Sequence, residues 1–204
     1  MTVSASLNVI LQVPMQKAVM VRELSSKMYT PTTSFLGRYI SSMIVQVIYP
    51  AIIIFLLFWN VGIVTDLENF YMLFAYATLA SFVFCGQGFL IGTLIANEDQ
   101  ASQINVLAIM ILFATSGVLA NINSFSPLLR FLVDYSPSRL NCEGIFRRVT
   151  INANKLDPLI NQEQILGGMA YTYGDQWCLI GLSIWFLGII VIGLIGVNLR
   201  YKNI

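Results

Sequence analysis

The sequence predicts an all-α integral membrane protein with four transmembrane helices. Of its 204 residues 57% are hydrophobic and only 10% are charged, whereas soluble domains carry about 25% charged residues. The mean hydropathy of +0.75 is correspondingly high. Four stretches contain no Asp, Glu, Lys or Arg at all: residues 43–63, 70–96, 104–120 and 177–197. These stretches would be apolar on every side of a helix, and a helix at the surface of a soluble protein keeps a polar face.

Composition also excludes several classes of function. The formal net charge is +1, so the chain lacks the basic surplus that binds nucleic acid. Because there is no His, His-based triads, general bases and zinc sites are excluded. No GxxxxGK[ST] phosphate loop occurs, and the three Cys share no metal-ligand spacing. We therefore expect no catalytic residue, no metal site and no cofactor held by this chain.

The N-terminal part contains two segments before the first span. Residues 1–12 are apolar but too short to cross a bilayer, which is typical of the end of a cut transmembrane helix or of a disordered tail. Residues 16–29 are predicted to form a cytoplasmic amphipathic helix, with Met20, Leu24 and Met28 on one face. This helix fits either a position in the membrane interface or docking to a cytoplasmic partner.

A second helix is expected to lead into the first span. Pro31 must end the preceding helix, and Thr32, Thr33 and Ser34 offer an N-cap for a helix that begins near Phe35. A helix of 21 residues is about 31 Å long, which is close to the roughly 30 Å thickness of the hydrocarbon core of a bilayer. The stretch 104–120 has only 17 residues and is therefore the marginal span. Both termini are predicted to be cytoplasmic because Lys and Arg flank the first and last spans. These residues are Lys17, Arg22, Lys27, Arg38, Arg200 and Lys202.

The segment 121–176 is then external. It is expected to hold short helices folded back onto the membrane rim, at residues 127–133 and 144–149, before the last span. Residues 152–164 are polar and are expected to be the solvent-exposed part.

The order of these parts resembles the permease of the G (white) subfamily of ABC transporters. The matching positions are Lys17, Arg22, Glu23, Tyr29, Phe35, Leu36, Arg38 and Pro50, the run SGVLAN at residues 116–121, and the run YSPSRLNCEG at residues 135–144. The resemblance implies that residues 1–204 are a single partial transmembrane domain without its nucleotide-binding domain. Residues 1–12 would end the second transmembrane helix, and the four spans would be the third to sixth.

The resemblance also implies roles for individual residues. Residues 16–29 would be the coupling helix that receives the movement of the nucleotide-binding domain, through Arg22, Glu23, Lys27 and Tyr29. Val118 and Leu119 would form a hydrophobic valve, and Pro137, Arg139 and Glu143 belong to the external motif. Met110 and Phe113 fall where relatives line a substrate cavity, although both also suit lipid-facing or packing positions.

Two functions follow as expectations. In the first, the chain is the permease part of an ATP-driven exporter of lipid, sterol or amphipathic compounds. It works in the lipid bilayer as a homodimer or heterodimer, and ATP and Mg are bound by a nucleotide-binding domain in cis or in trans. In the alternative, it is a truncated four-span membrane subunit that assembles with other permeases and transports nothing. An integral membrane enzyme is the weakest hypothesis, since no nucleophile with a base is present.

Overall fold

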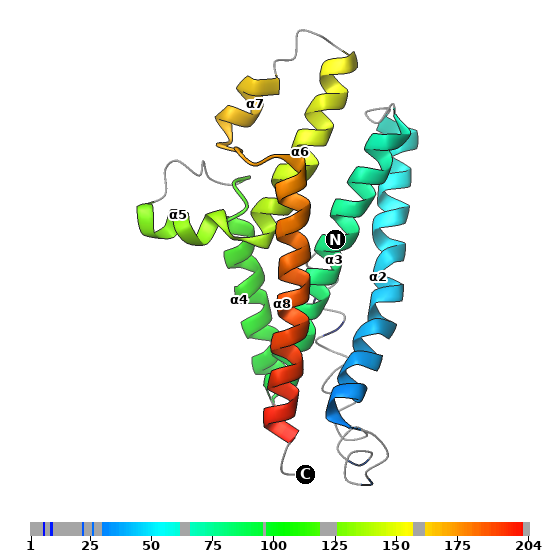
Figure 1. Cartoon of the computed structure of the whole chain (residues 1–204), viewed down its shortest axis with the longest axis vertical. Coiled ribbons are helices and arrows are strands. Elements are labelled where there is room, and N and C mark those ends of the chain that lie inside the picture. Colours follow the sequence, from blue (N-terminus) through cyan, green and yellow to red (C-terminus); the bar gives the residue numbers. More distant parts are fainter. Residues whose placement is uncertain are drawn as a thin grey trace. The chain divides into compact units, whose positions relative to one another are not determined.

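The computed structural model describes residues 6, 9, 22, 26, 30–61, 66–95, 97–118, 126–156 and 162–201. The regular elements of this part are all helices, with no strand among the residues described (Figure 1). They are α2 (Pro31–Val61), α3 (Leu67–Leu94), α4 (Glu98–Ala114), α5 (Pro127–Asp134), α6 (Pro137–Leu156), α7 (Gln162–Gly168) and α8 (Asp175–Tyr201). The all-α prediction is confirmed for these residues.

Within the described ranges, three helices are long and apolar enough to cross a membrane. They are Pro31–Leu57 of α2, Leu67–Leu94, which is α3, and Asp175–Leu199 of α8. These helices overlap the first, second and fourth charge-free stretches, so three of the four expected spans are confirmed as span-length apolar helices. In the most apolar part of α3, half of the residues are buried inside the chain. The corresponding share is 17% in α2 and 22% in α8. The helices α2 and α8 therefore turn most of their apolar surface away from the chain.

The helix over the third charge-free stretch, 104–120, begins and ends earlier in the chain than expected. The helix α4 has 17 residues and is about 26 Å long. It ends at Ala114, where the amide of Ser116 bonds the carbonyl of Phe113 at 3.1 Å and Gly117 adopts a φ of 82°. A left-handed glycine of this kind commonly terminates a helix. The predicted end at residue 120 is therefore wrong for the helix, and a fourth span stays a prediction.

The start of α2 also differs from expectation. The helix begins at Pro31, and its cap is Thr30, whose hydroxyl accepts a hydrogen bond from the Thr33 amide at 3.4 Å. Proline suits the first position of a helix because its missing N–H would have no partner there. The expected caps at residues 32–34 and the expected start near Phe35 are wrong for this reason.

The chain divides into two compact units, to both of which α2, α3, α4 and α8 contribute residues. The first unit comprises residues 1–48, 81–109 and 185–204. Its core includes Val197 and the ring of Phe89, which packs edge to face against the rings of Phe35 and Tyr39. A Cβ atom on Gly86 would lie 2.6 Å from the Ile189 side chain, so glycine permits the close helix contact.

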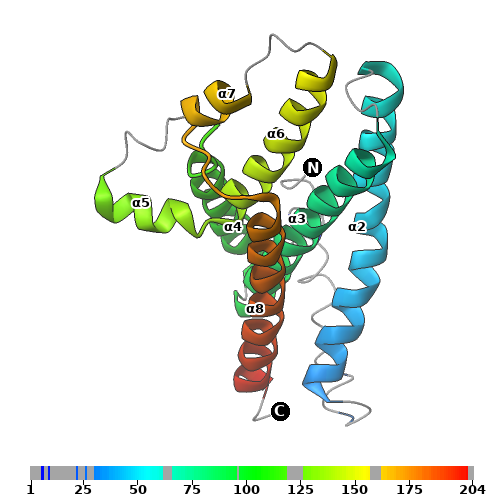
Figure 2. The ribbon, with the colours of Figure 1, turned by 45° about the horizontal axis from the view of Figure 1, so that its top comes forward.

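The second unit comprises residues 49–80 and 110–184. Here α6 lies against α7, and α5 runs crosswise to the start of α8 (Figure 2). The apolar face of α6 contacts α3 and α8, with Ile145 touching two clusters of buried side chains. A third cluster joins α5 to α7 through Val133, Leu166 and Tyr171.

The described part of residues 121–176 is more regular than expected. Instead of a short helix at residues 144–149, α6 is one continuous helix of 20 residues. Asn152, expected in a solvent-exposed part, is fully buried and accepts a hydrogen bond from the Asn69 amide group at 2.5 Å. No local pattern indicates this contact, because its two residues lie 83 positions apart.

Candidate functional site

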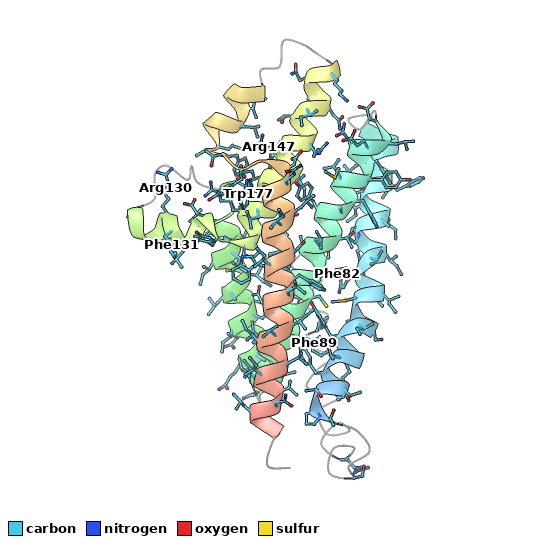
Figure 3. All side chains as sticks on the ribbon, in the orientation of Figure 1. Phe82, Phe89, Arg130, Phe131, Arg147 and Trp177 are labelled. Carbon is cyan, nitrogen blue, oxygen red and sulfur yellow. The ribbon has the colours of Figure 1, made fainter. Side chains whose placement is uncertain are left out.

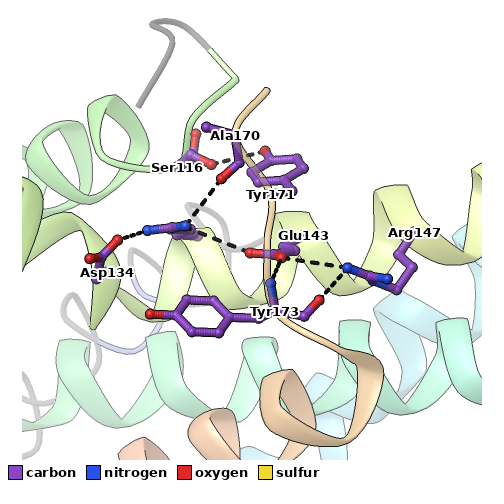
Figure 4. A network of polar contacts seen from close by, with 8 residues as sticks. Ser116, Asp134, Glu143, Arg147, Ala170, Tyr171 and Tyr173 are labelled. Carbon is purple, nitrogen blue, oxygen red and sulfur yellow. Dashed lines mark hydrogen bonds and ion pairs between the residues drawn. The ribbon is translucent and has the colours of Figure 1, made fainter. Parts of the chain in front are cut away.

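The helix α6 carries a buried row of charges. Arg139, Glu143 and Arg147 follow one another at intervals of four residues and so lie on one face of the helix. Glu143 is fully buried, and its carboxylate oxygens lie 3.7 Å from the Arg139 Nε and 3.9 Å from an Arg147 nitrogen (Figure 4). Buried charges are stable in a protein only when they are paired and hydrogen-bonded.

The connection between α7 and α8 forms hydrogen bonds with all three residues of this row. The backbone amide of Tyr173 donates to Glu143, and the Tyr173 carbonyl accepts from Arg147. The Arg139 guanidinium donates to the carbonyl of Ala170 at 3.3 Å and lies 5.1 Å from the centre of the Tyr173 ring. We call residues 169–174 the strap, because the backbone groups of Ala170 and Tyr173 hold this segment against α6 (Figure 4).

The charges in this cluster balance. At the end of α5, Asp134 pairs with the buried Arg139, so two carboxylates face two guanidinium groups. Burial raises the pKa of the Glu143 carboxyl above its ordinary value of 4.5, while the Tyr173 amide and the two arginines lower it in part. Desolvation therefore outweighs the attraction of the arginines at this carboxyl.

The strap and Ser136, the residue before α6, also hold the turn that follows α4. The Tyr171 hydroxyl donates to the Ser116 carbonyl at 3.0 Å, and the hydroxyls of Thr115 and Ser136 lie 2.9 Å apart. Burial raises the pKa of the Tyr171 phenol, which keeps this donor protonated. Two side-chain contacts thus fix the turn from different elements.

A second group of charges joins α3, α6 and α8. Arg148 lies 2.8 Å from the Asp175 carboxylate, donates to the Asn69 side-chain oxygen at 3.1 Å and reaches Glu68 at 3.5 Å. Asp175 lies in the first turn of α8, where a negative charge is favoured by the helix dipole. An exposed pair of Lys155 with Asp66 adds about 1 kcal/mol at most.

The external-motif residues lie in this site as follows. Pro137 is the first residue of α6, and Arg139 and Glu143 are at the centre of the buried row, with 2% and 0% of their surface exposed. The structure thus brings Arg139 and Glu143 together and places Pro137 at the start of the same helix.

The expected cavity and valve residues lie on and after α4. Met110 and Phe113 are 62% and 51% exposed in the single chain, and Val118 is 43% exposed in the turn. The amide of Val118 donates to the Ser116 hydroxyl at 3.3 Å. Leu119 lies outside the described residues. The roles of these residues stay predictions.

The expected coupling helix is described at two positions. Arg22 is exposed, and its carbonyl accepts a hydrogen bond from the Ser26 amide at 3.1 Å, the spacing of an α-helical turn. Glu23, Lys27 and Tyr29 lie outside the described residues. A helix over residues 16–29 stays a prediction.

The most connected residues of the site were not identified from the sequence. Tyr173 contacts all three charged residues of the row, and Asp134 completes the charge balance. The spacing of Arg139, Glu143 and Arg147 was the available signal, since charges four residues apart indicate one face of a helix. Nothing in the spacing indicates Tyr173, which is 30 positions from Glu143.

The charged groups of this site are paired with one another. Its carboxylates are matched by arginines and its tyrosine is a hydrogen-bond donor. In the part of the chain that the structure describes, no three His, Cys, Asp or Glu residues gather in a way that could hold a metal ion. The arrangement can hold α5, α6, the strap and the turn after α4 in fixed positions.

Comparisons with known proteins agree with this architecture. The model of the family described as "ABC-2 type transporter" matches residues 1–146. The chain is similar to ABC transporter G family member 14 of Arabidopsis thaliana, with 25% identity over 126 residues, which are 61% of this chain and 19% of that protein. It is also similar to ABC transporter G family member 25 of the same plant, with 27% identity over 120 residues, 57% of this chain and 18% of the relative. The matches thus span about a fifth of these relatives.

Proposed function

Because this chain belongs to the ABC-2 type transporter family, as a G-subfamily permease domain that crosses the membrane several times, we propose that it serves an ATP-driven exporter. The observation that carries this proposal is the family match over residues 1–146, which includes the expected coupling segment, α2, α3 and α4. The cargo in this proposal is a lipid, a sterol or another amphipathic compound, since the side chains that α4 exposes include the apolar Met110 and Phe113.

In this proposal the energy for transport comes from ATP bound by another domain. A nucleotide-binding domain, in the same polypeptide or on a partner, binds ATP and Mg. Its closure pushes residues 16–29, and Arg22, Glu23, Lys27 and Tyr29 pass the movement to α2. The single turn between Arg22 and Ser26 and the rigid start of α2 at Thr30 and Pro31 support this arrangement. Both termini lie on the cytoplasmic side in this proposal.

The path for the cargo lies along α4, in a homodimer or heterodimer. Met110 and Phe113 are more than half exposed in the single chain, so each has surface available for a second copy, for cargo or for lipid. Val118 and Leu119 form the seal at the end of this path. The turn that holds Val118 is fixed by Tyr171 and Ser136, which supports a seal of stable position.

The test separates coupling from ATP hydrolysis. The assembled transporter that contains this segment is placed in lipid vesicles, and Glu23 is changed to Lys. ATP hydrolysis is expected to continue, while ATP-dependent movement of a fluorescent phospholipid is lost. The matched control is Asp99→Lys, which reverses an exposed charge at the start of α4, on the side predicted to be cytoplasmic.

Two outcomes contradict the proposal. Equal transport per ATP in the Glu23→Lys and Asp99→Lys variants shows that residues 16–29 do not couple. Export of a small hydrophilic dye, with no movement of labelled phospholipid or sterol, shows that the cargo class is wrong.

A further inference from the structure

One buried serine shapes the turn that follows α4. Ser116 is fully buried, and its hydroxyl donates to the Phe113 carbonyl at 2.7 Å and accepts from the Val118 amide at 3.3 Å. Gly117, which separates Ser116 from Val118, has a φ of 82°, so the chain changes direction at this point. The Ser116 side chain therefore joins the last turn of α4 to Val118, the residue expected to form the seal.

Tyr171 of the strap reaches this serine from 55 positions later in the chain. Its hydroxyl donates to the Ser116 carbonyl at 3.0 Å (Figure 4). Tyr171 is only 4% exposed, and the centre of its ring lies 6.1 Å from that of Phe146 on α6. The place of the hydroxyl is thus fixed by the packing of the ring as well as by the hydrogen bond.

The strap that carries Tyr171 is itself held at several points. Where α7 ends, the amides of Ala170 and Tyr171 donate back to α7 carbonyls at 3.1 and 3.0 Å, in the paired pattern of a Schellman motif. The carbonyls of Ala170 and Tyr173 accept from two arginines of α6. Figure 3 shows one of these arginines, Arg147, near the start of α8, where the strap ends. Tyr171 therefore extends from a segment that is anchored on both sides of it.

The turn has further attachments that do not involve the strap. The hydroxyl of Thr115 lies 2.9 Å from that of Ser136, the residue before α6. The Ser116 hydroxyl also forms a hydrogen bond with the thiol of Cys142, which is a weak partner. Loss of the Tyr171 hydrogen bond is therefore expected to loosen the turn locally and to leave α4 folded.

We propose that Tyr171 is a positioning residue for the seal: through Ser116 it keeps Val118 in the closed position, and the seal opens when this hydrogen bond breaks. This inference rests on the seal that the proposed function assigns to Val118 and Leu119. A net hydrogen bond shifts an equilibrium about five-fold. Removal of the Tyr171 hydroxyl is therefore expected to raise the ratio of open to closed seals by about that factor.

The test compares Tyr171→Phe with Tyr76→Phe. Each change removes the hydroxyl of a buried tyrosine that donates to a backbone carbonyl, to Ser116 at 3.0 Å and to Asp175 at 2.8 Å respectively. The two variants are expected to lose similar stability, but only the first loses a contact with the turn. Their Tm values in detergent show whether both are folded and equally stable.

The first measurement is the mobility of the turn. A spin label is placed on the full chain in lipid vesicles through Val118→Cys, and the chain without this substitution gives the background from the native cysteines. Tyr171→Phe is expected to raise the mobile fraction of the label spectrum several-fold, whereas Tyr76→Phe is expected to leave it unchanged. Equal spectra in the two variants overturn the positioning role of Tyr171.

The second measurement is leakage through the assembled transporter with Val118 intact. Its probe is a fluorescent phospholipid or sterol, whichever moves with ATP. Without ATP, Tyr171→Phe is expected to pass this probe across the vesicle membrane about five-fold faster than Tyr76→Phe. A mobile label at position 118 without this leak shows that Tyr171 holds the turn but no seal, and this overturns the proposal.

Failure of the proposed function would give a different result. An unsubstituted transporter that moves neither probe with ATP contradicts the proposed function and the seal with it. The label at position 118 still shows in that case whether Tyr171 holds the turn, so the two failures are told apart.

Discussion

Gly144 of α6 lies against the ring of Tyr76, and the change Gly144→Ala tests this contact directly. An added Cβ would lie 2.6 Å from the Tyr76 Cζ and still closer to a neighbouring ring carbon. The ring cannot move freely, because Tyr76 is fully buried and its hydroxyl donates to the Asp175 carbonyl at 2.8 Å. The substitution therefore either distorts α6 or displaces the ring and breaks this hydrogen bond.

The magnitude follows from three contributions. Overpacking of a core costs about 1–3 kcal/mol, and loss of the Tyr76 hydrogen bond costs about 1 kcal/mol. Alanine regains about 1 kcal/mol over glycine in a helix. The expected net loss of stability in Gly144→Ala is about 2 kcal/mol. The matched control Gly167→Ala on α7 places its methyl group in open space and is expected to gain about 0.5–1 kcal/mol.

The assay is thermal unfolding of the full chain in detergent micelles, followed by tryptophan fluorescence. The two variants are expected to differ in Tm by roughly 6–12 °C, since 1 kcal/mol corresponds to about 2–4 °C in a chain of this size. In a Tyr76→Leu background the cost of Gly144→Ala should shrink by at least about 1 kcal/mol, because the ring is gone. A Gly144→Ala variant whose Tm equals or exceeds that of Gly167→Ala would show that the ring of Tyr76 does not oppose the added methyl group.

Three further predictions use the same assay. Ala170 has a φ of 57°, so Ala170→Gly should raise stability by about 0.5 kcal/mol or more, and a lower Tm would contradict the left-handed strain. The pKa of Glu143 is raised on folding, so the folded chain holds this proton at a pH where the unfolded chain has released it. Stability should therefore fall as pH rises from about 4.5 through the raised pKa, and Glu143→Gln should flatten this slope. Tyr171→Phe removes the hydrogen bond to Ser116 and should cost about 1 kcal/mol, while Tyr71→Phe, at an exposed ring, should cost almost nothing.

The spans were predictable because lipid imposes a simple rule on sequence. A long stretch without charge can meet only lipid or protein, so the helices around residues 43–63, 70–96 and 177–197 followed from composition alone. The helix ends were harder to predict. Pro31 fits both the end of one helix and the first position of the next, and the choice depends on the Thr30 hydroxyl in the folded chain.

Only those residues of the site that are close together in the sequence were predictable. Arg139 and Glu143 were identified because they stand in a short motif, and their four-residue spacing suits one helix face. Tyr173 and Asp134 reach the same carboxylate and guanidinium from other elements, through contacts that no local pattern encodes. The burial of Asn152 likewise depends on Asn69, 83 positions earlier.

The strap has a consequence for how the protein is made. Glu143 can meet Arg139 and Arg147 as soon as α6 forms, but its backbone donor at Tyr173 is synthesised 30 residues later. Until then the carboxylate of a helix that is to be buried lacks a hydrogen-bond partner, and burying it in that state is costly. The packing of α6 is therefore expected to be completed only after the strap has been synthesised. A chain that stops before Tyr173 lacks this donor, so α6 is expected to stay incompletely packed in it.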